Sequence, residues 1–130
     1  MKNFFFAFAL TLTTFALAAQ DSRYTAAMTD AVAQLDTTKT MADYQAVANT
    51  FSRIAAAEPK EWLPLYYASF SQLNAAFSLI KQDVAAALLT IDLAQANLDK
   101  ALALAPQESE LYVLQAYILI GRLMENPMAK

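Results

Sequence analysis

Residues that form tight turns are scarce in this chain, which has one glycine and four prolines among 130 residues. β-Sandwiches and barrels need such residues at each of their many turns. Alanine and leucine are abundant instead, and both favour helices. The chain is also 58% hydrophobic, which is too apolar for a disordered protein. The sequence therefore predicts an all-α protein, and its length suits a single domain.

The first 19 residues have the organisation of a secretory signal peptide. The basic start Met1-Lys2-Asn3 precedes an apolar run over residues 4–17, and Ala16-Leu17-Ala18 supplies small residues for cleavage. A retained membrane anchor is the alternative, but the run is short for a span of about 20 residues. We expect residues 1–19 to direct export to the periplasm, the cell envelope or the medium. Residues 20–130 then form the mature domain, without an integral membrane span.

The side-chain inventory argues against catalysis. The chain has no cysteine and no histidine, which removes most groups that activate nucleophiles or bind transition metals. The lone Gly121 excludes a glycine-rich phosphate loop, and Asp92 and Asp99 are expected on a solvated helix face. The net charge is −3, or −4 without Lys2, so no basic patch for nucleic acid is expected. We therefore expect neither enzymatic activity nor a cofactor, catalytic or metal site.

Apolar periodicity and proline positions predict five helices in the mature chain. Thr40, with Asp43 three residues later, is expected to cap the second helix. Pro59 ends this second helix and Pro106 ends the fourth, because proline cannot continue the helical hydrogen-bond ladder. The expected helices cover approximately residues 22–36, 41–58, 61–80, 84–105 and 109–124.

The two proline stops lie 47 residues apart and suggest an internal repeat. With this offset, Phe51 corresponds to Leu98 and Ser69 to Ala116. Small and apolar positions followed by a closing proline, over roughly residues 44–121, resemble the tetratricopeptide repeat (TPR). That resemblance implies antiparallel helical hairpins in a right-handed array of about five helices. An unrelated helical bundle is the alternative, since the usual TPR unit is about 34 residues long.

Two further segments, Ala55–Ala68 and Leu123–Met128, are similar to small exported TPR-like proteins of Gram-negative envelopes. Such arrays bind peptides or partner helices in a groove lined by the first helix of each hairpin. The resemblance therefore implies a partner-binding strip, and its expected members are Tyr66, Phe70, Asn74, Val113 and Tyr117. The alternative is that these aromatic residues lie in the core. No basic residue joins Asn74 before Lys81, so a C-terminal carboxylate is a poor candidate ligand.

The last expected helix is apolar on all sides, because residues 111–120 include a single polar side chain, Gln115. The run is too short to cross a bilayer, and a β-strand is its alternative conformation. A terminal helix has no following helix to cover its second face, and exposed apolar surface commonly marks an interaction site. We therefore expect a homodimer or a partner contact through Leu111, Leu114 and Ile118.

Together these features predict a non-catalytic protein–protein interaction or scaffold module. The competing hypothesis is a carrier of small apolar ligands, with a cavity lined by Tyr66, Phe70, Leu88 and Tyr117. Asp36-Thr37-Thr38 also resembles an Asp-Thr-x acceptor for O-glycosylation, but an ordinary turn between helices is the favoured interpretation.

Overall fold

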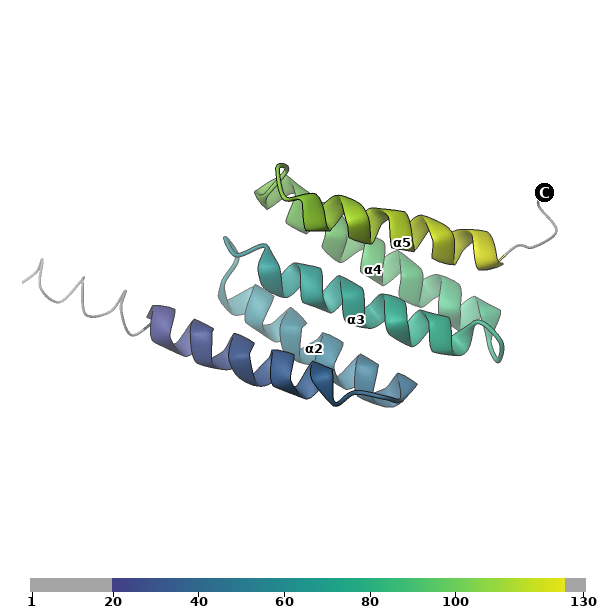
Figure 1. Cartoon of the computed structure of the whole chain (residues 1–130), viewed down its shortest axis with the longest axis horizontal. Helices are drawn as coiled ribbons and strands as arrows, with labels where there is room; N and C mark the ends of the chain where they lie inside the picture. Colours follow the sequence, from purple (N-terminus) through teal and green to yellow (C-terminus); the bar gives the residue numbers. More distant parts are fainter. Residues whose placement is uncertain (1–19, 126–130) are drawn as a thin grey trace, which may run out of the picture.

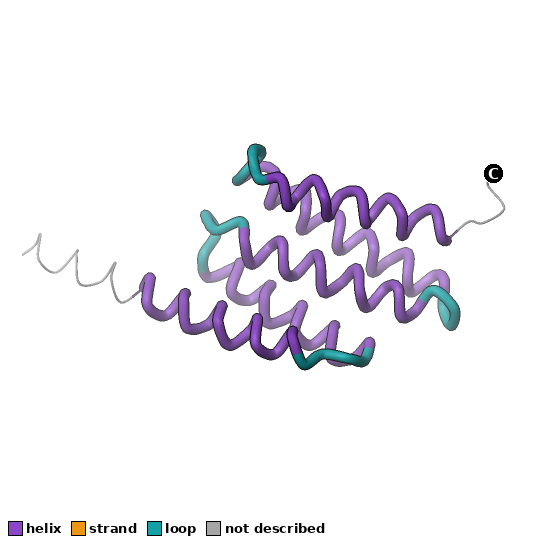
Figure 2. The backbone as a smooth tube through the Cα atoms, viewed as in Figure 1, coloured by secondary structure: helices purple, strands orange, loops and turns teal. Residues whose placement is uncertain are grey.

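The computed structural model describes residues 20–125, which form five helices joined by short loops (Figures 1 and 2). Residues 20–36 are helical, and no strand occurs between residues 20 and 125. The all-α prediction is confirmed, and the strand alternative for residues 111–120 is wrong. The proposed signal segment, residues 1–19, lies outside the described part. The four following helices are α2 (Met41–Ala57), α3 (Leu63–Leu79), α4 (Val84–Leu104) and α5 (Ser109–Glu125).

Local sequence signals explain where these helices begin. The Thr40 hydroxyl oxygen accepts a hydrogen bond from the Asp43 backbone N–H at 3.1 Å, as the capping pattern predicted. Asp83 caps α4 in the same way, with its carboxylate 2.9 Å from the Ala86 backbone nitrogen. Pro64 lies in the first turn of α3, where its missing N–H has no intrahelical partner to lose.

Consecutive helices are antiparallel and alternate between two layers. Residues 20–36, α3 and α5 lie in the nearer layer of Figure 1, and α2 and α4 lie behind them. Central helix α3 packs extensively against both α2 and α4, and it also contacts α5. The array therefore has two edges, formed by residues 20–36 at one side and by α5 at the other (Figure 1). None of the helices in the described region is long and apolar enough to cross a membrane.

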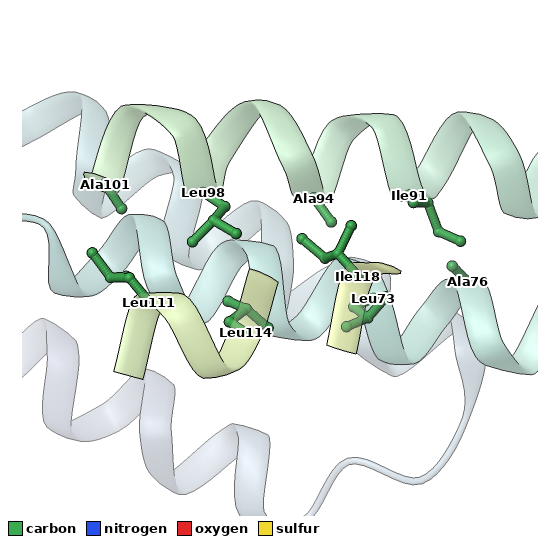
Figure 3. Close-up of a cluster of buried hydrophobic side chains, with 9 residues drawn as sticks. All are labelled: Leu73, Ala76, Ile91, Ala94, Leu98, Ala101, Leu111, Leu114 and Ile118. Carbon is green, nitrogen blue, oxygen red and sulfur yellow. The ribbon is translucent and has the colours of Figure 1, made fainter. Parts of the chain in front are cut away.

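Two apolar clusters share α3. The first joins residues 20–36 to α2 and α3 around the wholly buried Phe51. The second fills the space between α3, α4 and α5, and Figure 3 shows its side chains pointing toward one another. Ser69 lies where α3 approaches α4, and its buried hydroxyl donates a 2.7 Å hydrogen bond to the Ala94 carbonyl. A small side chain with a satisfied hydroxyl thus permits close packing of these two helices.

The residues expected to mediate self-association belong to this second cluster. Leu111, Leu114 and Ile118 are at most 2% exposed, and they pack against α3 and α4 within one chain (Figure 3). The prediction that they form an intermolecular contact is therefore wrong. The periodicity of α5 gives no indication of which apolar stripe faces the core, because the helix is apolar on all sides. Its exposed apolar residues are Tyr112, Val113, Tyr117, Leu119, Ile120, Leu123 and Met124.

Candidate protein-interaction surface

A row of aromatic side chains runs along α3. The Tyr66 and Phe70 rings are stacked, with centroids 6.4 Å apart and an interplanar angle of 17°. Trp62 meets Tyr66 edge-on at 6.1 Å, and Tyr67 does so at 5.1 Å. Phe51 on α2 stacks in turn against Tyr67, with centroids 5.0 Å apart. These contacts hold Tyr66 and Phe70 in fixed orientations, which lowers the entropy cost of using them to bind a partner.

Tyr66 and Phe70 are each partly buried, so they contribute to the core and to the surface at once. Both pack against the α3–α4–α5 cluster, yet neither reaches the full burial of Leu73 or Ala76. The alternatives of core and groove are therefore not exclusive at these two positions. Asn74, one turn further along, is also partly buried, and its Nδ2 donates to the Phe70 carbonyl at 2.8 Å. That bond fixes the position of the Asn74 amide beside the aromatic row.

The α5 members of the predicted strip lie on the side of α5 that adjoins α3. Val113, Tyr117 and Gly121 follow at four-residue spacing, which places them in one row along the helix. Gly121 is buried where α5 meets the core, since an added Cβ there would lie 3.2 Å from Phe77 Cε1 and 3.5 Å from Leu73 Cδ1 of α3, with Ile91 Cδ1 of α4 at 3.3 Å. Val113 and Tyr117 continue that row toward the start of α5, and both are about half exposed. The predicted strip thus lies on neighbouring helices of one layer (Figure 1).

Electrostatics act on the Tyr66 hydroxyl within this strip. Burial raises the pKa of Tyr66 above 10.0, and the negative charge of Glu110 and the neighbouring Tyr67 raise it further. Burial, together with Glu61 and Glu58, raises the pKa of Tyr24 in the same direction. Tyr66 therefore stays protonated at neutral pH and presents an apolar ring with a hydroxyl donor at its tip, a combination common at interfaces.

Glu110→Gln is expected to lower the pKa of Tyr66 toward its ordinary value, because one of the negative charges that oppose ionisation is removed. The raised pKa in the folded state contributes stability that is complete below the unfolded value of 10.0 and is lost as the pH rises through the folded value. Tyrosinate absorbance is followed during an alkaline titration. The difference from the curve of Tyr66→Phe gives the ionisation of Tyr66 alone. Glu108→Gln is the control. Equal curves for Glu110→Gln and the parent would contradict the assigned charge effect.

The residues expected to line a carrier cavity do not surround one. Leu88 and Tyr117 are exposed on α4 and α5, whereas Tyr66 and Phe70 belong to the aromatic row on α3. Packed side chains of the second cluster occupy the region between the three helices (Figure 3). Within residues 20–125, the predicted enclosed cavity between these helices is therefore wrong.

Two open grooves were not anticipated from the sequence. One, of about 580 Å³, lies between residues 20–27 and the end of α2. The other, of about 480 Å³, lies between α2, α3 and α4, with an apolar floor and with Asn97 and Lys100 among its lining residues. Both grooves depend on how helices distant in sequence pack together. The small residues Ala55 and Ala56 before Pro59 are the one sequence feature that indicates the groove between α2, α3 and α4.

The acidic residues considered for chemistry make structural contacts. Asp92 forms an ion pair with Arg122 of α5 at 2.8 Å, and Asp99 accepts a 2.8 Å hydrogen bond from Gln95 Nε2. In the described part of the chain, no three His, Cys, Asp or Glu residues are grouped so that they could hold a metal ion. The Thr37 and Thr38 hydroxyls both donate to the Gln34 carbonyl, at 2.9 and 3.0 Å, as in an ordinary helix-ending turn.

No protein-family model matches this chain, and neither the curated proteins nor the solved structures include a significantly similar one. The strongest arrangement is the surface formed by Tyr66, Phe70 and Asn74 on α3 with Val113 and Tyr117 on α5, hereafter called the aromatic strip.

Proposed function

We propose that this chain is an exported, non-catalytic protein–protein interaction module with a TPR-like array, which binds a peptide or partner helix at the aromatic strip. The observation that carries this proposal is the stacked, partly buried pair of Tyr66 and Phe70 on α3, with the half-exposed Tyr117 on the neighbouring helix α5. Aromatic residues held in packed surroundings account for much of the binding free energy at protein interfaces. The signal-like segment at residues 1–19 supports export to the periplasm or cell envelope.

The arrangement of the strip supports an elongated, largely apolar ligand. Its residues follow the axes of two neighbouring helices, so a bound segment lying between α3 and α5 would contact both rows. Apolar side chains of the ligand would bury the exposed parts of Phe70, Val113 and Tyr117. The Tyr66 hydroxyl and the Asn74 amide supply the polar contacts that set its orientation.

The proposal is tested by capture from envelope extract of a Gram-negative host that expresses the full chain with a C-terminal tag. The variant Tyr66→Ala/Phe70→Ala is expected to bind its partner at least about 30-fold more weakly, as loss of one interface hot spot of about 2 kcal/mol implies. Intact mass of the recovered chain shows whether residues 1–19 have been removed.

Leu89→Ala is the matched control, because Leu89 is an exposed apolar residue of α4 outside the strip. Circular dichroism of each purified variant establishes that the helices are retained. Equal partner recovery by the parent and the double variant would refute binding at the aromatic strip. An uncleaved chain that remains in the cytoplasm would refute export while leaving the binding result to be judged separately.

A further inference from the structure

The two edges of the array differ in polarity. Within residues 20–124, every large hydrophobic side chain that is highly exposed lies on α4 or α5. The opposite edge, formed by residues 20–36, exposes mainly polar residues, among them Asp21, Thr25, Thr29 and Asp30. Repeat arrays normally end in polar capping faces, and of these two edges only the one formed by residues 20–36 is polar. The α5 edge therefore has the character of an interface.

One face of α5 is separate from the aromatic strip and adjoins α4. Gln115 marks this side, because its amide exchanges hydrogen bonds of 2.9 and 3.0 Å with Gln95 of α4. Leu119 and Leu123 follow Gln115 at four-residue spacing, and they are 54% and 74% exposed. Tyr112 and Ala116 complete the face, and both are exposed. We call Tyr112, Ala116, Leu119 and Leu123 the α5 edge face.

The α5 edge face repeats a surface of α3 that already binds a helix. With the 47-residue offset, its four members correspond to Leu65, Ser69, Gln72 and Ala76. On α3 this surface receives α4: Ser69 is bonded to the Ala94 carbonyl, and Gln72 accepts a 2.9 Å hydrogen bond from Asn97. The corresponding face of α5 has apolar side chains at all four positions. Between residues 20 and 125, no helix covers it.

We propose that a second copy of this chain covers the α5 edge face, with the two α5 helices antiparallel about a two-fold axis. An antiparallel register centred between Ala116 and Leu119 places Tyr112 opposite Leu123 of the other copy. Small Ala116 near the axis lets the two helices approach closely. Such a contact is self-complementary, as a two-fold interface requires.

Charge favours the antiparallel direction. Acidic Glu108 lies one turn before Tyr112, whereas basic Arg122 lies next to Leu123. Only the antiparallel direction brings Glu108 of one copy to the end of α5 that carries Arg122 of the other. A single guanidinium nitrogen of Arg122 bonds Asp92, and the group has further N–H donors. Antiparallel helices also align their opposing dipoles favourably.

Burial of the α5 edge face leaves few polar groups unsatisfied. The Tyr112 hydroxyl already donates a 2.6 Å hydrogen bond to the Pro106 carbonyl, so its ring can lose water without losing a partner. The Gln95–Gln115 and Asp92–Arg122 pairs flank the face on the α4 side. This arrangement, an apolar centre with a satisfied polar rim, is typical of protein interfaces.

The absence of cysteine from the sequence permits a direct test, with the full chain expressed and recovered from the host cell. Ala116→Cys is expected to form a covalent dimer under mild oxidation, whereas Ala33→Cys, an exposed alanine on the opposite edge, forms little. Sedimentation velocity is expected to show a dimer for the parent. Leu119→Glu is expected to sediment as a monomer, because an unpaired charge would be buried at the centre of the contact.

Leu89→Glu controls for the introduced charge, since Leu89 is exposed outside this face, and it should sediment as the parent does. A parent that is monomeric at all concentrations overturns the proposal, even if another protein is captured at α5. Equal cross-linking of Ala116→Cys and Ala33→Cys overturns it as well, as does a Leu119→Glu variant that remains dimeric. Because this face excludes the aromatic strip, the proposal stands or falls independently of partner binding there.

Discussion

Ile118→Ala is expected to lower the free energy of unfolding by about 2–5 kcal/mol. The Ile118 side chain is wholly buried between α3, α4 and α5, so its truncation removes apolar contacts and leaves a cavity. A domain of this size has a total stability of about 5–15 kcal/mol, and the variant therefore loses a large share of it. Urea denaturation followed by circular dichroism measures the change.

Ile120→Ala is the matched control, because it makes the same substitution on the same helix at a position 49% exposed. Its effect on stability is expected to stay within about 0.5 kcal/mol. The pair distinguishes a core role for the buried stripe of α5 from a role in association. If Ile120→Ala were the more damaging of the two, the rotation of α5 described above would be wrong.

The importance of that stripe follows from the seam between α4 and α5. With the 47-residue offset, Ala48 and Ala68 at the α2–α3 seam correspond to Gln95 and Gln115. Both alanines are buried, and α2 and α3 pack more extensively than α4 and α5 do. At the α4–α5 seam the longer amide side chains take the place of these alanines and bond to each other. The apolar contacts between α5 and the core are therefore made mainly by Leu111, Leu114 and Ile118.

Much of the fold was predictable from the sequence, because its signals are local. The Thr40 cap, the stops before Pro59 and Pro106, and the apolar periodicity of α2 each depend on a few neighbouring residues. These signals locate helices, but they do not specify how each helix is rotated. On α2 a narrow apolar stripe around Phe51 identifies the buried side, whereas α5 has apolar residues on every side.

The candidate site was predictable to the same degree. Helical spacing places Tyr66, Phe70 and Asn74 in one row, and the TPR resemblance adds Val113 and Tyr117. The first three do lie along α3, and the other two lie on the adjacent helix α5. The partial burial of Tyr66 depends on its contacts with Trp62, Tyr67 and the neighbouring helices. Helical periodicity does not show how much of a side chain such contacts cover. The α5 edge face could not be predicted from the sequence either, because it can be identified only once the side of α5 that faces the core is known.

Phe51→Ala is expected to be at least as destabilising as Ile118→Ala. It should lower the free energy of unfolding by about 3–5 kcal/mol, because it removes a large, wholly buried ring. Part of this loss, about 0.5–1.5 kcal/mol, is the stacking contact with Tyr67. Phe51→Leu should cost less, because it retains most of the apolar volume. Thermal or urea denaturation of both variants provides the comparison.

The effect of Phe51→Ala should also be uneven along the chain. Phe51 belongs to the cluster that joins residues 20–36, α2 and α3, whereas α4 and α5 are held by the other cluster. In a stacked array stability is carried by neighbouring contacts, so hydrogen exchange should accelerate most in residues 20–36 and α2. Uniform acceleration would instead show one cooperative unit. Phe51 stacks on Tyr67, and Tyr67 lies edge-on to Tyr66. The variant should therefore also loosen the aromatic strip and weaken the binding proposed there.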